Sequence, residues 1–366
     1  MIRSTILKNL PHRSSSDIGT NANHQYPQKG IDHVNNTSFY IIQLQGGTSV
    51  STLFFSNQFQ KGATQMATVV QTHVFGMTED GGNPCPLVLG GESLTSEQMQ
   101  QIAARFGVET AFILSPDRPT SLFKLRYFVP NHEMSMCVHA TVGAVSYWCM
   151  SQQRSQIQGT IETPLGEVKV RAQEKHERLQ VTVNQFPPEF SEKNPTLAEV
   201  AQALRISEEA FDLSIGPIQS VSTARPKLMI PLRNGNTLQR LEPDFALLWE
   251  LCDRYGTTGF YPFTLRPQSA PCDVEARQFP NQVGYNEDPA TGVAACALGA
   301  YLAFYSPSRH QQNGRYAYTV GQGFAMGRPS LLETAGIVSK NHIIQTCVGG
   351  TATISQMKKV DLQSLL

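Results

Sequence analysis

Two runs of small residues, far apart in the chain, constrain the fold of this 366-residue protein most strongly. One run, VHATVGAVS, follows Cys137, and the other, GVAACALGA, follows the sequence NEDPAT at residues 286–291. Small side chains let a helix pack closely against its neighbours, so each run predicts a helix buried inside a curved sheet. Because a strand and a loop precede each run, the sequence predicts an α+β fold that repeats one design in two pseudo-symmetric halves.

Local signals are clearest between residues 67 and 129. Alternating or apolar patterns predict three strands, at residues 67–76, 108–114 and 122–129. Residues 77–86, with two glycines and two prolines, have the chemistry of a turn. Thr95 and Gln98 form a capping box for a helix that should end at Gly107.

The second half contains two further local patterns. Residues 272–280, CDVEARQFP, alternate between apolar and polar side chains, which predicts another strand. The sequence GQGFAMG at residues 321–327 is a near-match to a phosphate loop. It follows no clear strand–helix pattern, so a turn before a strand is the better interpretation.

Candidate functional residues lie where strands and helices meet. Glu109 lies between a helix and a strand, Cys137 and His139 open the first small-residue run, and Asp288 precedes the second. The start of a helix offers unpaired N–H groups and partial positive charge, so two such starts facing each other would hold an anionic substrate. Each residue also has a structural alternative.

These structural alternatives assign no chemistry to the four residues. Asp288 could be a plain helix N-cap, His139 a satisfied core histidine, and Cys137 a small buried apolar residue. Glu109 could be a buried acid paired with Arg105 or Arg126.

Composition narrows the class of partner. Lys and Arg together number 29, as do Asp and Glu, so the formal net charge is +0 and no basic block suggests nucleic acid or a membrane surface. No apolar stretch is long enough for a membrane span. The seven cysteines form no C-x-x-C pair, which predicts free thiols in the cytoplasm and no structural metal. The expected partner is a small molecule.

The chain is predicted to have three parts. Residues 1–65 are poor in periodic apolar residues, which favours a disordered extension over an organelle transit peptide. Residues 66–185 should form the N-terminal half and residues 186–366 the C-terminal half. The final strands of the C-terminal half are expected to pack back on the first.

Five segments of the chain resemble the signature blocks of the PhzF family, in the family's order. They are GGNPCPLVL (81–89), SEQMQQIAARFGVETAFIL (96–114), LRYFVPNHEMSMCVHATVGA (125–144), ARQFPNQVGYNEDPATGVAA (276–295) and GQGFAMGRPSLL (321–332). The resemblance covers roughly residues 67–355. It implies the diaminopimelate epimerase-like fold, with a central helix in each of two halves.

The resemblance also implies a mechanism. Glu109 matches the acid/base of the family's characterised isomerase, and His139 and Asp288 match its conserved histidine and aspartate blocks. In related epimerases and racemases two facing cysteines exchange protons with the substrate, and here Cys137 and Asp288 occupy those positions. Thr291 and the N–H of Gly292 are expected to hold a substrate carboxylate. The chemistry requires no cofactor or metal.

Two departures from the family pattern leave three hypotheses open. Val138 replaces the glycine that usually precedes the histidine, and Val293 replaces a small or hydroxylated residue. The favoured hypothesis is an isomerase that shifts a proton in a small carboxylated metabolite through Glu109. The others are an epimerase or racemase using Cys137 and Asp288, and a non-catalytic small-molecule binder. A homodimer is left open as an alternative to a monomer.

Overall fold

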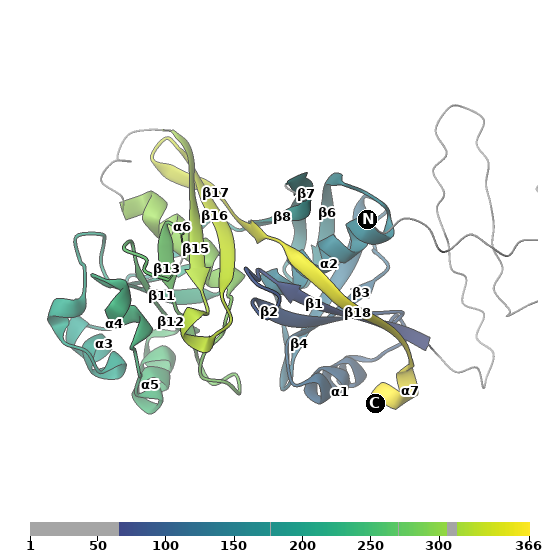
Figure 1. The fold of residues 1–366 in the computed structure, drawn as a ribbon, viewed down its shortest axis with the longest axis horizontal. Helices are drawn as coiled ribbons and strands as arrows, with labels where there is room; N and C mark the ends of the chain where they lie inside the picture. The colour runs from purple at the N-terminus through teal and green to yellow at the C-terminus, as the bar shows by residue number, and fades with distance from the viewer. Residues whose placement is uncertain (1–65, 176, 270, 306–312) are drawn as a thin grey trace, which may run out of the picture. The chain divides into compact units, whose positions relative to one another are not determined.

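Two buried helices, α2 (Val138–Ser151) and α6 (Gly292–Tyr305), form the centres of the fold (Figure 1). The computed structural model describes residues 66–366 apart from positions 176, 270 and 306–312, so the prediction for residues 1–65 lies outside the described residues. Every residue from Gly292 to Ala303 is buried, and α2 is buried from Val138 to Ser146. A helix that is apolar on all sides must be enclosed, as both small-residue runs predicted.

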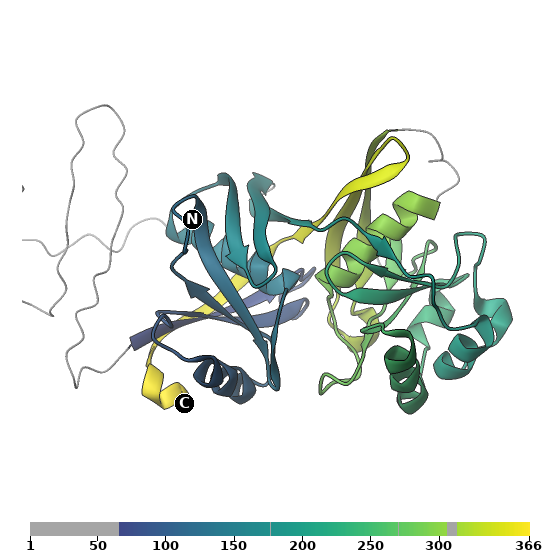
Figure 2. The same ribbon diagram turned by 180° about the vertical axis from the view of Figure 1, so that it is seen from behind.

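Strands up to Gln185 surround α2. They are β1 (Met66–Val74), β2 (Asn83–Leu89), β3 (Thr110–Leu114), β4 (Ser121–Val129), β5 (His132–Met134), β6 (Gln156–Thr163), β7 (Gly166–Lys175) and β8 (Arg178–Gln185). β1 pairs antiparallel with β2, β2 pairs parallel with β3, and β6, β7 and β8 form an antiparallel meander. The α2 helix contacts β1, β2, β3, β7 and β8, so these strands curve around it (Figure 2).

Several of the strands after Gln185 surround α6. The strands in this part of the chain are β9 (Glu189–Phe190), β10 (Gln219–Ser222), β11 (Pro226–Pro231), β12 (Gly259–Thr264), β13 (Val274–Ala276), β14 (Phe279–Pro280), β15 (Gly314–Gln322), β16 (Ser330–Ser339), β17 (His342–Gly350) and β18 (Ala352–Asp361). The α6 helix contacts β10, β11, β15, β16 and β17. The pairings are mixed, since β11 runs parallel to β12 whereas β15, β16 and β17 are antiparallel.

The last strands return to the first part of the chain. β17 pairs with β8, and β18 pairs with β1 along its whole length from Met66↔Asp361 to Val74↔Ala352. One hydrophobic core runs through residues of both α2 and α6. The division at residue 185 therefore stays a prediction, because the described residues all belong to one compact unit, Thr64–Leu366.

The remaining helices cover the outer sides of the sheets. They are α1 (Ser96–Phe106), α3 (Leu197–Leu204), α4 (Gly235–Gln239), α5 (Phe245–Tyr255) and α7 (Leu362–Leu365), with short 3₁₀ turns η1 (Glu208–Ala210) and η3 (Phe324–Met326). The capping box of α1 is confirmed: Thr95 accepts from the Gln98 N–H at 3.3 Å, and the Gln98 side chain accepts from the Thr95 N–H at 2.9 Å. Gly107 ends the helix with φ 70°. No helix among the described residues is long and apolar enough to cross a membrane.

Two local predictions were wrong in part. The predicted turn at 77–86 ends early, because β2 already begins at Asn83 and contains Pro84 and Pro86. β3 pairs with β2 only from Leu87 onward, which is after both prolines. Their missing N–H groups therefore leave no gap in the pairing between β2 and β3.

The pattern at 272–280 was also misread, because the strand is not half exposed. All residues from Val274 to Pro280 are buried, the polar ones included. Glu275 accepts hydrogen bonds from the backbone N–H groups of Gln268 and Ser269, at 2.8 and 3.1 Å. These bonds satisfy a charge that the alternating pattern assigned to solvent.

Candidate active site

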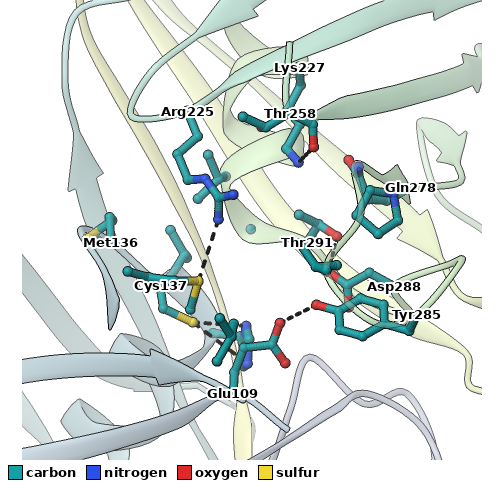
Figure 3. Close-up of a pocket in the computed structure, with 18 of the residues that line it drawn as sticks. Glu109, Met136, Cys137, Arg225, Lys227, Thr258, Gln278, Tyr285, Asp288 and Thr291 are labelled. Carbon is teal, nitrogen blue, oxygen red and sulfur yellow. Dashed lines mark hydrogen bonds between the residues drawn. The ribbon is translucent and has the colours of Figure 1, made fainter. Parts of the chain in front are cut away.

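A pocket lies where α2 and α6 begin, and it gathers all the predicted site residues (Figure 3). The predicted residues that line it are Glu109, Cys137, His139, Asp288, Thr291 and Gly292. The cavity volume is about 60 Å³, so only a small molecule fits without movement of the walls. The two helix starts therefore face one site, as the repeated design predicted.

Glu109 enters the pocket from the residue just before β3. Its side chain is buried, with the residue 9% exposed, and one carboxylate oxygen accepts a hydrogen bond from the Tyr285 hydroxyl. The alternative pairing with an arginine is wrong. Arg126 binds Glu133 at 2.6 Å, and Arg105 donates to the Ser364 carbonyl at 2.7 Å. Glu109 thus faces the pocket rather than a structural cation.

Asp288 enters from the opposite side, held by a set of side-chain donors. Its Oδ1 accepts from Asn83 Nδ2 at 2.7 Å, and its Oδ2 accepts from the Thr291 hydroxyl. Gln322 Nε2 donates to the Asp288 carbonyl at 2.6 Å. Because α6 begins at Gly292, Thr291 and not Asp288 occupies the N-cap position. Burial, followed by the charge of Glu109, raises the pKa of Asp288 to about 7.

Cys137 and His139 lie together at the start of α2. Cys137 is the N-cap residue, and its Sγ lies 3.4 Å from Nδ1 of His139. Burial raises the pKa of the Cys137 thiol well above its ordinary value, with contributions from Cys85 and Glu109. Burial also lowers the pKa of His139, so its imidazole is neutral at neutral pH. The pair can therefore offer a thiol and a neutral ring to a ligand.

The two valines that depart from the family pattern both line the pocket. Val138 packs against the backbone of Gly292: a Cβ added at Gly292 would lie 2.4 Å from Val138 Cγ1. Val293 forms part of the first turn of α6 and is buried. The valines narrow the space between the two helix starts.

Several functional candidates were missed by the sequence reasoning. Asn83, Gln278, Tyr285 and Gln322 lie inside or beside the quoted signature blocks, but no local pattern distinguishes them from turn or strand residues. Arg225 and Lys227 also line the pocket. A lysine at the head of the apolar strand KLMIP was the available signal for a buried charge. Among the described residues, no three His, Cys, Asp or Glu side chains group as metal ligands.

The chain is similar to known proteins both in sequence and in fold. A family model described as "Phenazine biosynthesis-like protein" (PhzC-PhzF) matches residues 72–358. The "Uncharacterized isomerase YfhB" of Bacillus subtilis (strain 168) is 30% identical over 295 residues, covering 80% of this chain and 98% of that protein. The "Uncharacterized isomerase YddE" of Escherichia coli (strain K12) is 33% identical over 284 residues, covering 75% and 91%.

Solved structures share the fold. A Bacillus anthracis phenazine biosynthesis protein of the PhzF family superposes with a TM-score of 0.72 at 24% identity, covering 81% of this chain and 99% of that one. A hydroxyproline epimerase from Agrobacterium vitis gives a TM-score of 0.56 at 12% identity, with 81% and 92% covered. The fold is thus the predicted diaminopimelate epimerase-like α+β fold, and the chain belongs to the phenazine biosynthesis-like (PhzC-PhzF) family.

Proposed function

We propose that this protein is an isomerase that moves a proton between two carbons of a small carboxylated metabolite, with Glu109 as the acid and base. The observation that carries the proposal is the meeting of Glu109 and Asp288, from two distant segments of the chain, in one buried pocket. Two carboxyl groups whose environments differ are suited to separate roles in proton transfer. The two relatives YfhB and YddE are both named as isomerases, which supports the same class of reaction.

The proposed reaction conserves all atoms of the substrate. Glu109, as a carboxylate, takes a proton from one carbon while the electron pair of that C–H bond shifts into the adjoining double-bond system. The protonated Glu109 then returns the proton to a different carbon, which completes the double-bond shift. The Tyr285 hydroxyl, which donates to Glu109, orients the carboxylate between these two steps.

The other predicted residues are assigned supporting roles. Asp288 has a raised pKa and would hold a proton close to neutral pH, so the role of the proton-accepting base is assigned to Glu109. His139 would present a neutral ring to the substrate. Cys137, Thr291 and Gly292 would contact the substrate from the starts of α2 and α6.

The alternative epimerase needs Cys137 as a thiolate base facing Asp288. Both residues line the pocket, which supports that reading. Burial, however, raises the pKa of the Cys137 thiol, so the thiolate is scarce at neutral pH. The isomerase is therefore the better proposal. A non-catalytic binder, which Val138 and Val293 suggested, would show no turnover with any carboxylate that it binds.

The test compares two variants on a carboxylate identified by a thermal-shift screen. The proposal expects Cys137→Ala to retain turnover within about tenfold, since the thiol only contacts the substrate. Alkylation of Cys137 in the wild type should reduce turnover because the added group fills the pocket, and not because a catalytic thiol is lost. Turnover that is lost with Cys137→Ala but kept with Glu109→Gln would favour the epimerase, because the two bases of that reaction are Cys137 and Asp288.

A further inference from the structure

One part of the pocket contains two basic side chains that form no salt bridge within the described residues. Arg225 and Lys227 both line the pocket, at the start of β11. Within the described residues neither forms a salt bridge: Arg225 Nη1 contacts Met134 Sδ at 3.5 Å, and Lys227 Nζ donates to the Thr258 carbonyl at 2.9 Å. An ammonium group has three donors and a guanidinium five, so most of these donors lack a partner.

Gln278 adds an unpartnered amide to the same pocket. The residue is 1% exposed, and among the described residues neither Nε2 nor Oε1 has a hydrogen-bond partner. Gly259, at φ 144°, makes room for this amide, because a Cβ there would lie 2.4 Å from Gln278 Nε2. Buried amides in native proteins are almost always paired, so an amide left open at a pocket wall points to a ligand.

The side-chain donor at the start of α6 is already engaged. The Thr291 hydroxyl donates to Asp288, and the Thr291 N–H lies 3.3 Å from Gln322 Oε1. Val138 occupies the space where a side chain at Gly292 would lie. The side-chain donors that remain for an anion therefore lie beside Arg225 rather than at Thr291.

We propose that Arg225, Lys227 and Gln278 form the subsite that binds the substrate's carboxylate. The inference rests on the proposed function, because it assigns an anchor to the molecule whose proton Glu109 moves. The guanidinium fork can bind a carboxylate through two parallel hydrogen bonds, and the ammonium and the amide add single donors. Figure 3 shows the Arg225 guanidinium reaching into the pocket from the side of Lys227, with Glu109 on the opposite side. A carboxylate held there leaves the rest of the molecule directed toward the base.

The charge state of Lys227 supports this assignment. Burial, followed by the charge of Arg225, lowers the pKa of Lys227 to about 7, while Asp288 and Cys252 act in the opposite direction. An anion bound beside it would favour the protonated amine and raise that pKa again. Above pH 7 the free lysine is neutral, so carboxylate binding should weaken as the pH rises, and it should be accompanied by proton uptake.

The test measures binding, without reference to turnover. Crotonate, succinate and benzoate are each compared with their primary amides by thermal shift and calorimetry. At least one acid should stabilise the wild type while its amide does not. Arg225→Met and Lys227→Met should each lower the affinity for that acid by about 10- to 100-fold, which is the effect of losing a charge-assisted hydrogen bond. The exposed control Arg118→Met should retain the wild-type affinity.

Arg225→Lys serves as the second variant, because it keeps the charge and loses the fork. It should bind with intermediate affinity, and its melting temperature without ligand checks that the fold is intact. The inference is overturned if none of these acids stabilises the wild type, if acid and amide bind alike, or if Arg225→Met and Lys227→Met both keep the wild-type affinity. If acids bind through Arg225 but turnover is unaffected by Glu109→Gln, the proposed function fails and the subsite stands.

Discussion

Asp288 is a buried carboxyl group of the pocket that neighbouring side chains hold in place. Asn83 and Thr291 donate to its two carboxylate oxygens, and burial raises its pKa to about 7. Hydrogen bonds from Thr291 and the charge of Lys227 lower that pKa, but burial and Glu109 outweigh them. The protonation of Asp288 therefore changes in the range where the proposed reaction would operate.

This raised pKa predicts the pH dependence of turnover. Below about pH 7 Asp288 is protonated, whereas above it this side chain carries a negative charge in the pocket that it shares with Glu109. We expect kcat/KM to fall as the pH rises through about 7. Asp288→Asn, which stays neutral at every pH, should make that fall smaller and leave the part that comes from deprotonation of Lys227, while it keeps turnover at lower pH. An unchanged fall in the Asn variant would assign it to another group, with Lys227 the first to examine.

Among residues, the sequence identified those with a local signal and missed those without one. Glu109, Cys137 and Asp288 lie beside recognisable helix starts and strand ends, and all of them reach the pocket. Tyr285 and Gln278 reach it only because the chain between β12 and α6 folds over the site. Such an approach depends on tertiary packing, which no spacing of residues along the chain encodes.

At the level of elements, α2 and α6 pack tightly against each other where both helices begin. Val138 of α2 fills the space where a side chain at position 292 of α6 would lie. The valine departs from the family pattern, and the glycine opposite makes its presence compatible with the fold. The two helices thus fit each other through a large residue on one and the smallest residue on the other.

Gly292→Ala should disturb this fit. The added Cβ would lie 2.4 Å from Val138 Cγ1, so we expect a loss of about 1–3 kcal/mol in the free energy of unfolding, as for other overpacked cores. Val138→Ala in the same chain should restore part of that loss, which a double-mutant cycle in denaturant would measure. Gly314→Ala is the control, because nothing lies within 4 Å of its added Cβ. Equal losses at positions 292 and 314 would contradict the packing argument.

Elements with strong local chemistry were predicted best. The capping box at Thr95 and the stop at Gly107 place α1 correctly because both act within a few residues. The strand at Asn83 was hidden by its prolines, whose tolerance depends on where β3 begins to pair. The burial of Glu275 and Arg277 was hidden likewise. Their partners, such as Ser269 and Glu287, lie in loops, and no local sequence pattern indicates that these loops contact the two buried charges.

At the scale of the whole molecule, the return of the last strands joins the two ends of the described chain. β18 pairs with β1, and β17 pairs with β8, so the segment after α6 is bonded to strands around α2. These pairings, with one core shared by both helices, bring Glu109 and Asp288 to one pocket. They also allow Glu109 to bind Tyr285, which lies 176 positions further along the chain. The repeated design in the sequence predicted two similar centres, and long-range pairing determines how they meet.

The most direct test of the proposed function is the effect of Glu109→Gln on proton transfer in D₂O. The wild type should isomerise a carboxylate that stabilises it, and NMR should follow the product and any deuterium taken up from solvent. Glu109→Gln keeps the shape of the side chain but cannot carry a proton, so it should bind the same carboxylate while turnover falls by about 100- to 10,000-fold. Turnover at the wild-type rate in this variant would contradict the assignment of Glu109 as the acid and base.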